Sequence, residues 1–175
     1  MEKNIVLVGF MATGKSMVGR AVAKKLGRKF IDIDEEIVRN SKMSISEIFK
    51  KYGEDRFRAL ESEAIEKFSS EKRLVIATGG GALIREENVD RLKKNGVLIC
   101  LTASPEVILK RVGTDTNRPI LDVVDKVLTI ERKLEERQRY YALSDISLDS
   151  EIGDVDEIAE NVIKAFLEFV KDGKN

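Results

Sequence analysis

The fold of this chain is decided near its start, where residues 9–16 read Gly9-Phe10-Met11-Ala12-Thr13-Gly14-Lys15-Ser16. This stretch fits the pattern G-x-x-x-x-G-K-[ST] at every position. It follows a short apolar run, Asn4–Val8, which we predict to be a strand, and it precedes a helical pattern from Met17 to Leu26. A strand, a glycine-rich loop and a helix in this order are the context that the pattern requires. The three parts together predict a phosphate-binding loop (P-loop).

The chemistry of the P-loop follows from its residue types. Glycines allow a backbone path in which several N–H groups converge on phosphate oxygens, and the start of the helix adds a favourable dipole. Lys15 is expected to bridge the β- and γ-phosphates, and the Ser16 hydroxyl to complete the shell of a Mg²⁺ ion. Because glycine makes up about 7% of residues, a chance match in so short a chain is expected on the order of 1% of the time or less. The loop therefore predicts binding of a nucleoside triphosphate and leaves the second substrate open.

Outward from this loop, β-rich runs alternate with helical patterns along the whole chain. This alternation predicts a three-layer α/β/α fold with helices on both faces of a five-stranded sheet, and the apolar runs favour buried parallel strands. Start signals for helices include a capping box from Ser44 to Glu47. No repeat or linker divides the chain, so we expect one domain over residues 1–175. The predicted strands are Asn4–Val8, Lys29–Ile33, Arg73–Ala77, Gly96–Leu101 and Asp145–Leu148.

The composition limits the classes of function. The 31 Lys+Arg residues balance the 31 Asp+Glu residues, so net charge gives no reason to expect binding to nucleic acid or to an anionic membrane. The absence of histidine excludes histidine triads, bases and metal ligands. Cys100 lies in an apolar run, where we interpret it as a core residue of a protein in a reducing compartment. The sequence shows neither the pattern of a signal peptide nor an apolar stretch of about 20 residues, and we expect a cytoplasmic location.

Three features fall beyond the carboxyl ends of the predicted strands, where open α/β sheets bind their ligands. They are Asp32 with Asp34, Gly79–Gly81, and Arg58 in the helical stretch between them. Each has a plainer interpretation, since the acids could cap the next helix, the glycines could form only a tight turn, and the arginine could be a solvated charge. Their shared edge with the P-loop favours a site in which a carboxylate holds a substrate hydroxyl and accepts its proton. An arginine opposite would suit a substrate that bears a carboxylate.

Three further arginines are candidates for this site. Arg118 lies in the polar segment Gly113–Pro119, which is either a mobile loop or an ordinary surface connection. If that loop closes, Arg118 could reach the transferring phosphoryl group. Arg137 lies in a very charged helix, where composition alone indicates a solvated face. The third candidate is Arg111.

In this order and at this spacing, the residues make the chain resemble the shikimate kinase family over nearly its whole length. The chain departs from the family pattern at Ala12, where glycine is common, at Met17, where threonine is usual, and at Arg139, where proline is usual. We expect Ala12 to be tolerated if its φ stays negative. The motifs that carry the resemblance are the P-loop with Val18-Gly19-Arg20, Asp32-Ile33-Asp34, Phe57-Arg58 with Glu61, Gly79–Gly81, Arg118-Pro119-Ile120-Leu121, and Arg137 with Tyr141.

The resemblance implies a P-loop kinase fold with a substrate-binding segment at about residues 32–62 and a mobile lid at about residues 112–121. It implies ATP-dependent phosphorylation of the 3-hydroxyl of shikimate, on the route to chorismate and the aromatic amino acids, with Mg²⁺ as cofactor. The implied catalytic residues are Asp34, Lys15 and Arg118. The implied ATP site comprises Ala12, Thr13, Gly14, Lys15, Ser16, Met17, Arg111 and Arg118. The implied substrate site comprises Asp34, Arg58, Gly79, Gly80, Gly81 and Arg137, and the implied metal site comprises Ser16 and, through a water, Asp32.

Two alternatives remain at this point. One is another small-metabolite P-loop kinase, acting on gluconate or a nucleoside monophosphate, although gluconate kinases carry a histidine that this chain lacks. The other is a catalytically silent P-loop domain that senses a metabolite, against which the intact Lys15, Asp34 and Arg58 count. As partners we expect the small molecules ATP and shikimate, no nucleic acid, no membrane, and no second copy of the chain, because we expect a monomer.

Overall fold

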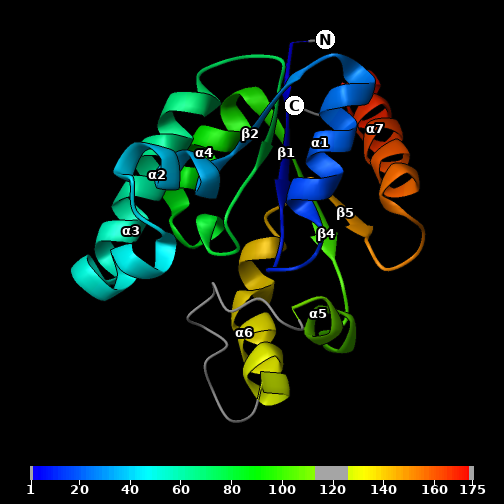
Figure 1. Cartoon of the computed structure of the whole chain (residues 1–175). Helices are drawn as coiled ribbons and strands as arrows, with labels where there is room; N and C mark the ends of the chain where they lie inside the picture. Colours follow the sequence, from blue (N-terminus) through cyan, green and yellow to red (C-terminus); the bar gives the residue numbers. More distant parts are fainter. Residues whose placement is uncertain (1, 113–125, 174–175) are drawn as a thin grey trace.

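A computed structural model describes residues 2–112 and 126–173. Five strands of the described chain form one parallel sheet in the order β2-β3-β1-β4-β5 (Figure 1). The five predicted strands are confirmed, with shifts of a residue at several ends. Arg73, predicted as the first residue of a strand, lies outside the observed strand, because its φ of 61° is in the left-handed region, which β structure does not use. The strands are β1 (Asn4–Val8), β2 (Lys29–Asp32), β3 (Leu74–Ala77), β4 (Gly96–Thr102) and β5 (Ile146–Asp149).

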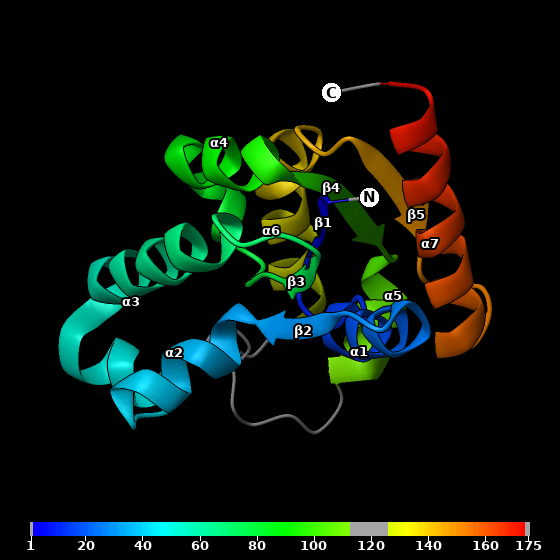
Figure 2. The ribbon, with the colours of Figure 1, turned by 90° about the horizontal axis from the view of Figure 1, so that it is seen from above.

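Helices cover both faces of this sheet, which confirms the predicted three layers (Figures 1 and 2). Helices α1 and α7 pack on one face, in a core cluster that includes Leu7, Val22 and Phe166. Helices α2, α3 and α4 pack on the other face, around Ile76 and Leu98. The helices are α1 (Lys15–Leu26), α2 (Ile33–Ser41), α3 (Ile45–Ser69), η1 (Ala82–Ile84), α4 (Glu86–Asn95), α5 (Pro105–Val112), α6 (Lys126–Tyr141) and α7 (Val155–Lys171).

Side-chain caps set the starts of the helices that lead toward the site. The capping box predicted at Ser44 is present, with Glu47 as its second member. Asp32 caps α2 through bonds from the N–H groups of Asp34 and Glu35, and for this reason the predicted strand ends at Asp32 rather than at Ile33. Helix α3 is interrupted at Gly53, whose φ of 80° is not helical. The structure therefore confirms the capping interpretation for Asp32, whereas Asp34 lies in the first turn of α2 and does not cap it.

The register of the sheet brings three loops to one level. Asp32 pairs with Ala77, and Ala77 pairs with Leu7, so the segments after β2, β3 and β1 begin side by side. Helix α6 crosses the same end of the molecule (Figure 1). In the described parts of the chain, no helix combines the length and the apolar character that crossing a bilayer would require. Of the predicted lid, residues 113–121 and with them Arg118 lie outside the described residues.

Candidate active site

The P-loop between β1 and α1 depends on two glycines. Gly9 has a φ of 133°, and a Cβ there would lie 2.3 Å from the carbonyl oxygen of Leu101. Gly14 has a φ of 91° and is the N-cap of α1. Only glycine adopts these backbone angles at low cost, and the missing side chain at Gly9 allows the loop to lie tightly against β4.

Ala12 gives a correction, because its φ is 59°. The condition under which we expect Ala12 to be tolerated, a negative φ, is therefore not met. The Thr13 hydroxyl donates to the carbonyl oxygen of Phe10 at 2.8 Å, and Arg111 Nη1 donates to the carbonyl oxygen of Ala12 at 3.4 Å. These contacts hold the loop in a left-handed turn, which costs a non-glycine residue about 1–2 kcal/mol. These two hydrogen bonds therefore stabilise a backbone conformation that is unfavourable for alanine.

Lys15 and Ser16 lie at the first turn of α1. The Lys15 ammonium group is buried and donates to the carbonyl oxygens of Gly9 and Phe10 at 2.9 and 2.6 Å. The Ser16 hydroxyl donates to Asp32 Oδ2 at 2.5 Å, while Asp32 Oδ1 accepts the bonds that cap α2. A hydroxyl and a carboxylate thus meet beside the N-terminus of α1, where a nucleotide phosphate would bind.

Two carboxylates meet at the first glycine of the Gly79–Gly81 turn. A Cβ on Gly79 would lie 2.6 Å from Glu61 Oε1 and 3.0 Å from Asp34 Oδ1. Glu61 is fully buried, and burial raises the pKa of its carboxyl above the ordinary value, a rise that the neighbouring Arg58 opposes only in part. The glycine turn thus lets two acids from α2 and α3 approach its backbone.

Arg58 lies at the last glycine of the same turn. Its Nη1 donates to Glu61 Oε2 at 2.8 Å and its Nη2 to Glu54 Oε1 at 3.1 Å, and a Cβ on Gly81 would lie 2.5 Å from Nη2. Burial alone would lower the pKa of this guanidinium, but Glu61 and Glu54 outweigh burial and raise that pKa. Only 9% of Arg58 is exposed, so the interpretation of a solvated surface charge is wrong for this residue.

Arg137 approaches the middle glycine from α6. It is 9% exposed, its guanidinium carbon lies 5.5 Å from the centroid of the Phe10 ring, and a Cβ on Gly80 would lie 3.3 Å from its Nη1. The solvated face that composition alone indicates for this position is therefore also wrong. Arg139, in place of the family's usual proline, is compatible with this placement, since α6 continues as a helix to Tyr141.

The chain shares this architecture with one family in particular. The sequence model of shikimate kinase matches residues 11–167. The chain belongs to the shikimate kinase family. The shikimate kinase of Thermodesulfovibrio yellowstonii is 49% identical over 98% of this chain and 99% of that protein. The shikimate kinase of Thermoanaerobacter pseudethanolicus is 46% identical over 97% of this chain and 99% of that protein.

Solved structures give the same relation. A shikimate kinase from Acinetobacter baumannii in complex with shikimate has a TM-score of 0.92 to this chain at 36% identity, covering 95% of this chain and 93% of that one. A gluconokinase from Sinorhizobium meliloti has a TM-score of 0.56 at 19% identity, covering 99% of this chain and 98% of that one, and this shows a shared fold only. The closer similarity in sequence and in structure is thus to shikimate kinases.

The remaining predicted residues of this shikimate kinase family member lie around the P-loop. Arg111 connects the P-loop to the segment after β5, since it also donates to the carbonyl oxygen of Ser150 at 2.5 Å. Met17 is on α1 and 63% of it is exposed. Glu54 and Tyr141 were not predicted as site residues, although the four-residue spacing of Glu54 and Arg58 is typical of a helical ion pair. The signal for Tyr141 was its place four residues after Arg137, in a motif that contributes to the family resemblance.

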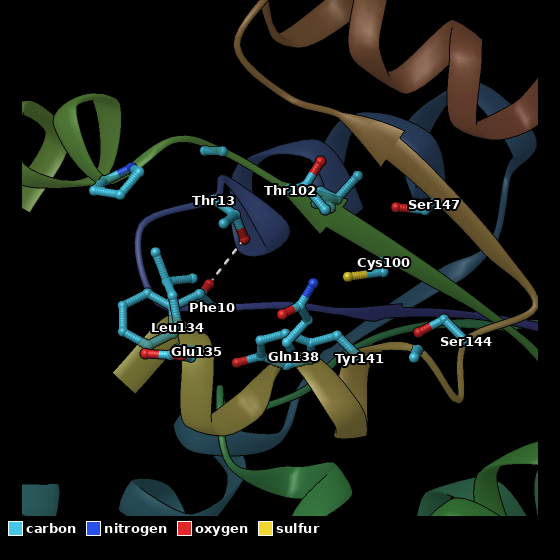
Figure 3. Close-up of a pocket in the computed structure, with 14 residues that line it drawn as sticks. Phe10, Thr13, Cys100, Thr102, Leu134, Glu135, Gln138, Tyr141, Ser144 and Ser147 are labelled. Carbon is cyan, nitrogen blue, oxygen red and sulfur yellow. Dashed lines mark hydrogen bonds between the residues drawn. The ribbon is translucent and has the colours of Figure 1, made fainter. Parts of the chain in front are cut away.

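A separate pocket of about 550 Å³ lies between α6, β4 and β5 (Figure 3). Phe10 and Thr13 line it from the P-loop, Cys100 from β4, and Gln138 and Tyr141 from α6. Burial raises the pKa of the Cys100 thiol to about 11, which agrees with the interpretation of Cys100 as a core residue and not a nucleophile. The lining contains neither Asp34 nor the two site arginines, so this pocket is distinct from the glycine-turn site.

Proposed function

We propose that this chain transfers the γ-phosphoryl group of ATP to the 3-hydroxyl of shikimate. The observation that carries the proposal is the meeting of Asp34, Arg58 and Arg137 on the Gly79–Gly81 turn, beside the P-loop. A carboxylate and two guanidinium groups around one backbone turn suit a substrate that bears both a hydroxyl and a carboxylate. The relatives are shikimate kinases, and this points to the same substrate.

On the substrate side, we assign the hydroxyl to Asp34 and the carboxylate to Arg58 and Arg137. Asp34 would orient the hydroxyl toward the γ-phosphate and accept its proton as the bond to phosphorus forms. The two guanidinium groups can each offer a pair of N–H donors to a carboxylate. The backbone of Gly79, Gly80 and Gly81 completes this side of the site, within a substrate-binding segment that we place at about residues 32–62 and the turn.

On the nucleotide side, we assign the phosphates to the P-loop. The N–H groups from Ala12 to Met17 surround them, and Lys15 stabilises the charge that spreads over the transferring group. Phosphate oxygens would compete for Lys15 with the carbonyl oxygens of Gly9 and Phe10. Arg111 is assigned to the adenine side, and Arg118, outside the described residues, to the phosphates from a lid at about residues 112–121.

The residues beside the P-loop fit a Mg²⁺ ion. The Ser16 hydroxyl and Asp32 Oδ2 lie 2.5 Å apart, and hard oxygen ligands of this kind are those that Mg²⁺ prefers. Among the described residues there is no cluster of three acidic or cysteine ligands, which suits an ion that takes its other ligands from water and phosphate. We propose that Ser16 binds Mg²⁺ directly and Asp32 through water. The ion, when bound, would neutralise charge on the phosphates.

We further propose that the chain is one catalytic domain that acts as a monomer in the cytoplasm, where ATP is available. The alternatives of a gluconate kinase, a nucleoside monophosphate kinase or a silent sensor predict different outcomes of one assay. ADP release is measured by a coupled reaction with shikimate, gluconate or AMP as the acceptor. Shikimate-dependent release supports the proposal. Absent release, or release that does not depend on shikimate, would overturn it.

The role of Asp34 is tested by Asp34→Asn, with Asp90→Asn on the exposed face of α4 as the matched control. The amide keeps the size of the side chain but cannot accept the hydroxyl proton. We expect Asp34→Asn to lose turnover while ATP binding stays nearly unchanged, and Asp90→Asn to keep both. A wild-type rate in Asp34→Asn would show that Asp34 does not hold the hydroxyl.

A further inference from the structure

Helix α6 contacts the glycine turn with two side chains that lie one helical turn apart. Tyr141 donates its phenolic hydrogen to the carbonyl oxygen of Gly80 at 2.7 Å. Arg137, four residues earlier and hence on the same face of α6, lies against the Cα of the same glycine. The tyrosine therefore touches the backbone of the turn that the site arginines and acids also approach.

The turn itself could adopt more than one conformation. The N–H of Ala82 donates to the carbonyl oxygen of Gly79 at 3.2 Å, which makes residues 79–82 a β-turn with glycine at both central positions. Gly81 has φ −109° and ψ 6°, the angles of a type I turn. A type II turn would keep the same closing bond but would rotate the central Gly80–Gly81 peptide, and it requires a positive φ at Gly81, which glycine adopts readily.

The bond from Tyr141 distinguishes these two conformations. In a type II turn the carbonyl oxygen of Gly80 would point away from its present direction, so the bond to Tyr141 can form only in the type I turn. No described peptide bond is cis, and in a trans peptide the N–H points opposite to the carbonyl. Because Tyr141 holds the carbonyl oxygen of Gly80 toward α6, the N–H of Gly81 points in the opposite direction, away from Tyr141.

The N–H of Gly81 is placed to serve the substrate. Gly81 packs against the Arg58 guanidinium, and within residues 2–112 and 126–173 no oxygen accepts a hydrogen bond from this N–H. A backbone donor beside a guanidinium complements a carboxylate that binds both. Tyr141 also keeps its own proton under assay conditions, because burial raises its pKa to about 12.

We propose that Tyr141 is a positioning residue, which holds the Gly80–Gly81 peptide in the orientation that aims the Gly81 N–H at the substrate carboxylate. The proposal rests on the proposed function, because it takes the carboxylate of shikimate as the group that is recognised. It adds a residue that need not touch the substrate and that acts through one backbone peptide.

The test compares Tyr141→Phe with Tyr140→Phe. Tyr140 precedes Tyr141 on α6, and its hydroxyl accepts a bond from the exposed Arg139 at 2.7 Å, so the control also loses one phenolic hydroxyl. Binding of shikimate and of ADP to each purified protein is measured by calorimetry. We expect Tyr141→Phe to bind shikimate about tenfold more weakly, the range for one lost hydrogen bond that orders a donor to a charged group. ADP affinity should be unchanged, and Tyr140→Phe should bind both ligands like the wild type.

Other outcomes overturn the proposal. Shikimate affinity within twofold of the wild type would show that the turn does not need Tyr141, and an equal loss of ADP affinity, or failure of the variant to fold, would show a merely structural role. As a second measurement, the analogue with the carboxylate reduced to a primary alcohol should lose less affinity from Tyr141→Phe than shikimate does. An equal loss would contradict the link to the carboxylate. Failure of the wild-type protein to phosphorylate shikimate would instead refute the proposed function, and the two failures are thus distinguishable.

Discussion

Replacing Gly79 by alanine tests whether the positions of the Asp34 and Glu61 carboxylates depend on the missing side chain at Gly79. A Cβ at this position would lie 2.6 Å from Glu61 Oε1 and 3.0 Å from Asp34 Oδ1. Since carbon and oxygen pack at about 3.4 Å, Glu61 Oε1 would have to retreat by about 0.8 Å and Asp34 Oδ1 by about half as much. Glu61 is fully buried and also holds Arg58, so it has little room to give.

The size of the effect follows from these shifts. A displacement approaching 1 Å of a group that aligns a reactant can lower the rate about 10²-fold, and overpacking of this kind destabilises a protein by about 1–3 kcal/mol. We therefore expect Gly79→Ala to lower kcat about 10²-fold with shikimate and to lower Tm by about 2–12 °C for a chain of this length. ADP affinity should stay the same, because the atoms nearest to this Cβ belong to Glu61 and Asp34 and not to the P-loop.

Coupled ADP release and thermal unfolding measure both effects, and Gly27→Ala serves as the matched control. Gly27 is the C-cap of α1, with a φ of 59° and no atom within 4 Å of an added Cβ. That variant should lose about 1 kcal/mol of stability through backbone strain and keep its kcat. The reasoning would be refuted if Gly79→Ala kept kcat within threefold of the wild type, or if Gly27→Ala lowered kcat as much as Gly79→Ala does. Either result would show that catalysis does not need the close approach of Glu61 and Asp34 to Gly79.

Three further predictions concern the P-loop, the metal and the cysteine. Ala12→Gly removes the strain of an alanine in the left-handed region but increases the entropy of the unfolded chain. The free energy of unfolding in urea should therefore rise by up to about 1 kcal/mol. A fall in the free energy of unfolding would show that the turn is not strained. Chelation by EDTA should abolish turnover. Because Ser16→Ala removes one oxygen ligand, it should raise the Mg²⁺ concentration that gives the half-maximal rate by roughly tenfold or more. An unchanged Mg²⁺ titration would contradict the assignment of Ser16. Because the pKa of Cys100 is raised from 9.0 to about 11, ionisation alone should slow labelling by Ellman's reagent at pH 8 about 100-fold relative to the unfolded chain. Labelling should accelerate about tenfold per pH unit up to that pKa, and equal rates in the folded and unfolded chains would contradict the burial.

Most of the fold could be predicted because its three central strands are apolar runs that are buried on both faces. β1, β3 and β4 are buried along nearly their whole length, and a parallel sheet covered on both faces produces such runs. The errors lie at the ends, where one local contact decides the conformation. Ile33 belongs to α2 because the Asp32 side chain caps that helix, and the pattern of hydrophobic residues does not reveal this contact.

The site was less predictable, since its alternatives depended on tertiary contacts. Sequence alone left Asp32 either a helix cap or a functional acid. The structure shows that its Oδ1 caps α2 while its Oδ2 accepts a hydrogen bond from Ser16, and the functional role of Asp32 stays a prediction. Arg58 and Arg137 have the local surroundings of solvated helix charges, and only packing against the glycine turn shows them to be buried. The role of Arg118 stays a prediction.

The absence of side chains at Gly79–Gly81 connects these observations. An added Cβ would meet the two acids at the first glycine, Arg137 at the second and Arg58 at the third. Three consecutive positions without a Cβ thus admit groups of both charges to one short backbone segment, and their mutual pairing offsets the cost of burying them. A substrate that offers a hydroxyl to the acids and a carboxylate to the arginines would replace part of the pairing between these side chains. Selectivity between substrates would therefore depend on the distance between the acids and the arginines along the turn. A chain with zero net charge can in this way hold a site of strongly localised charge.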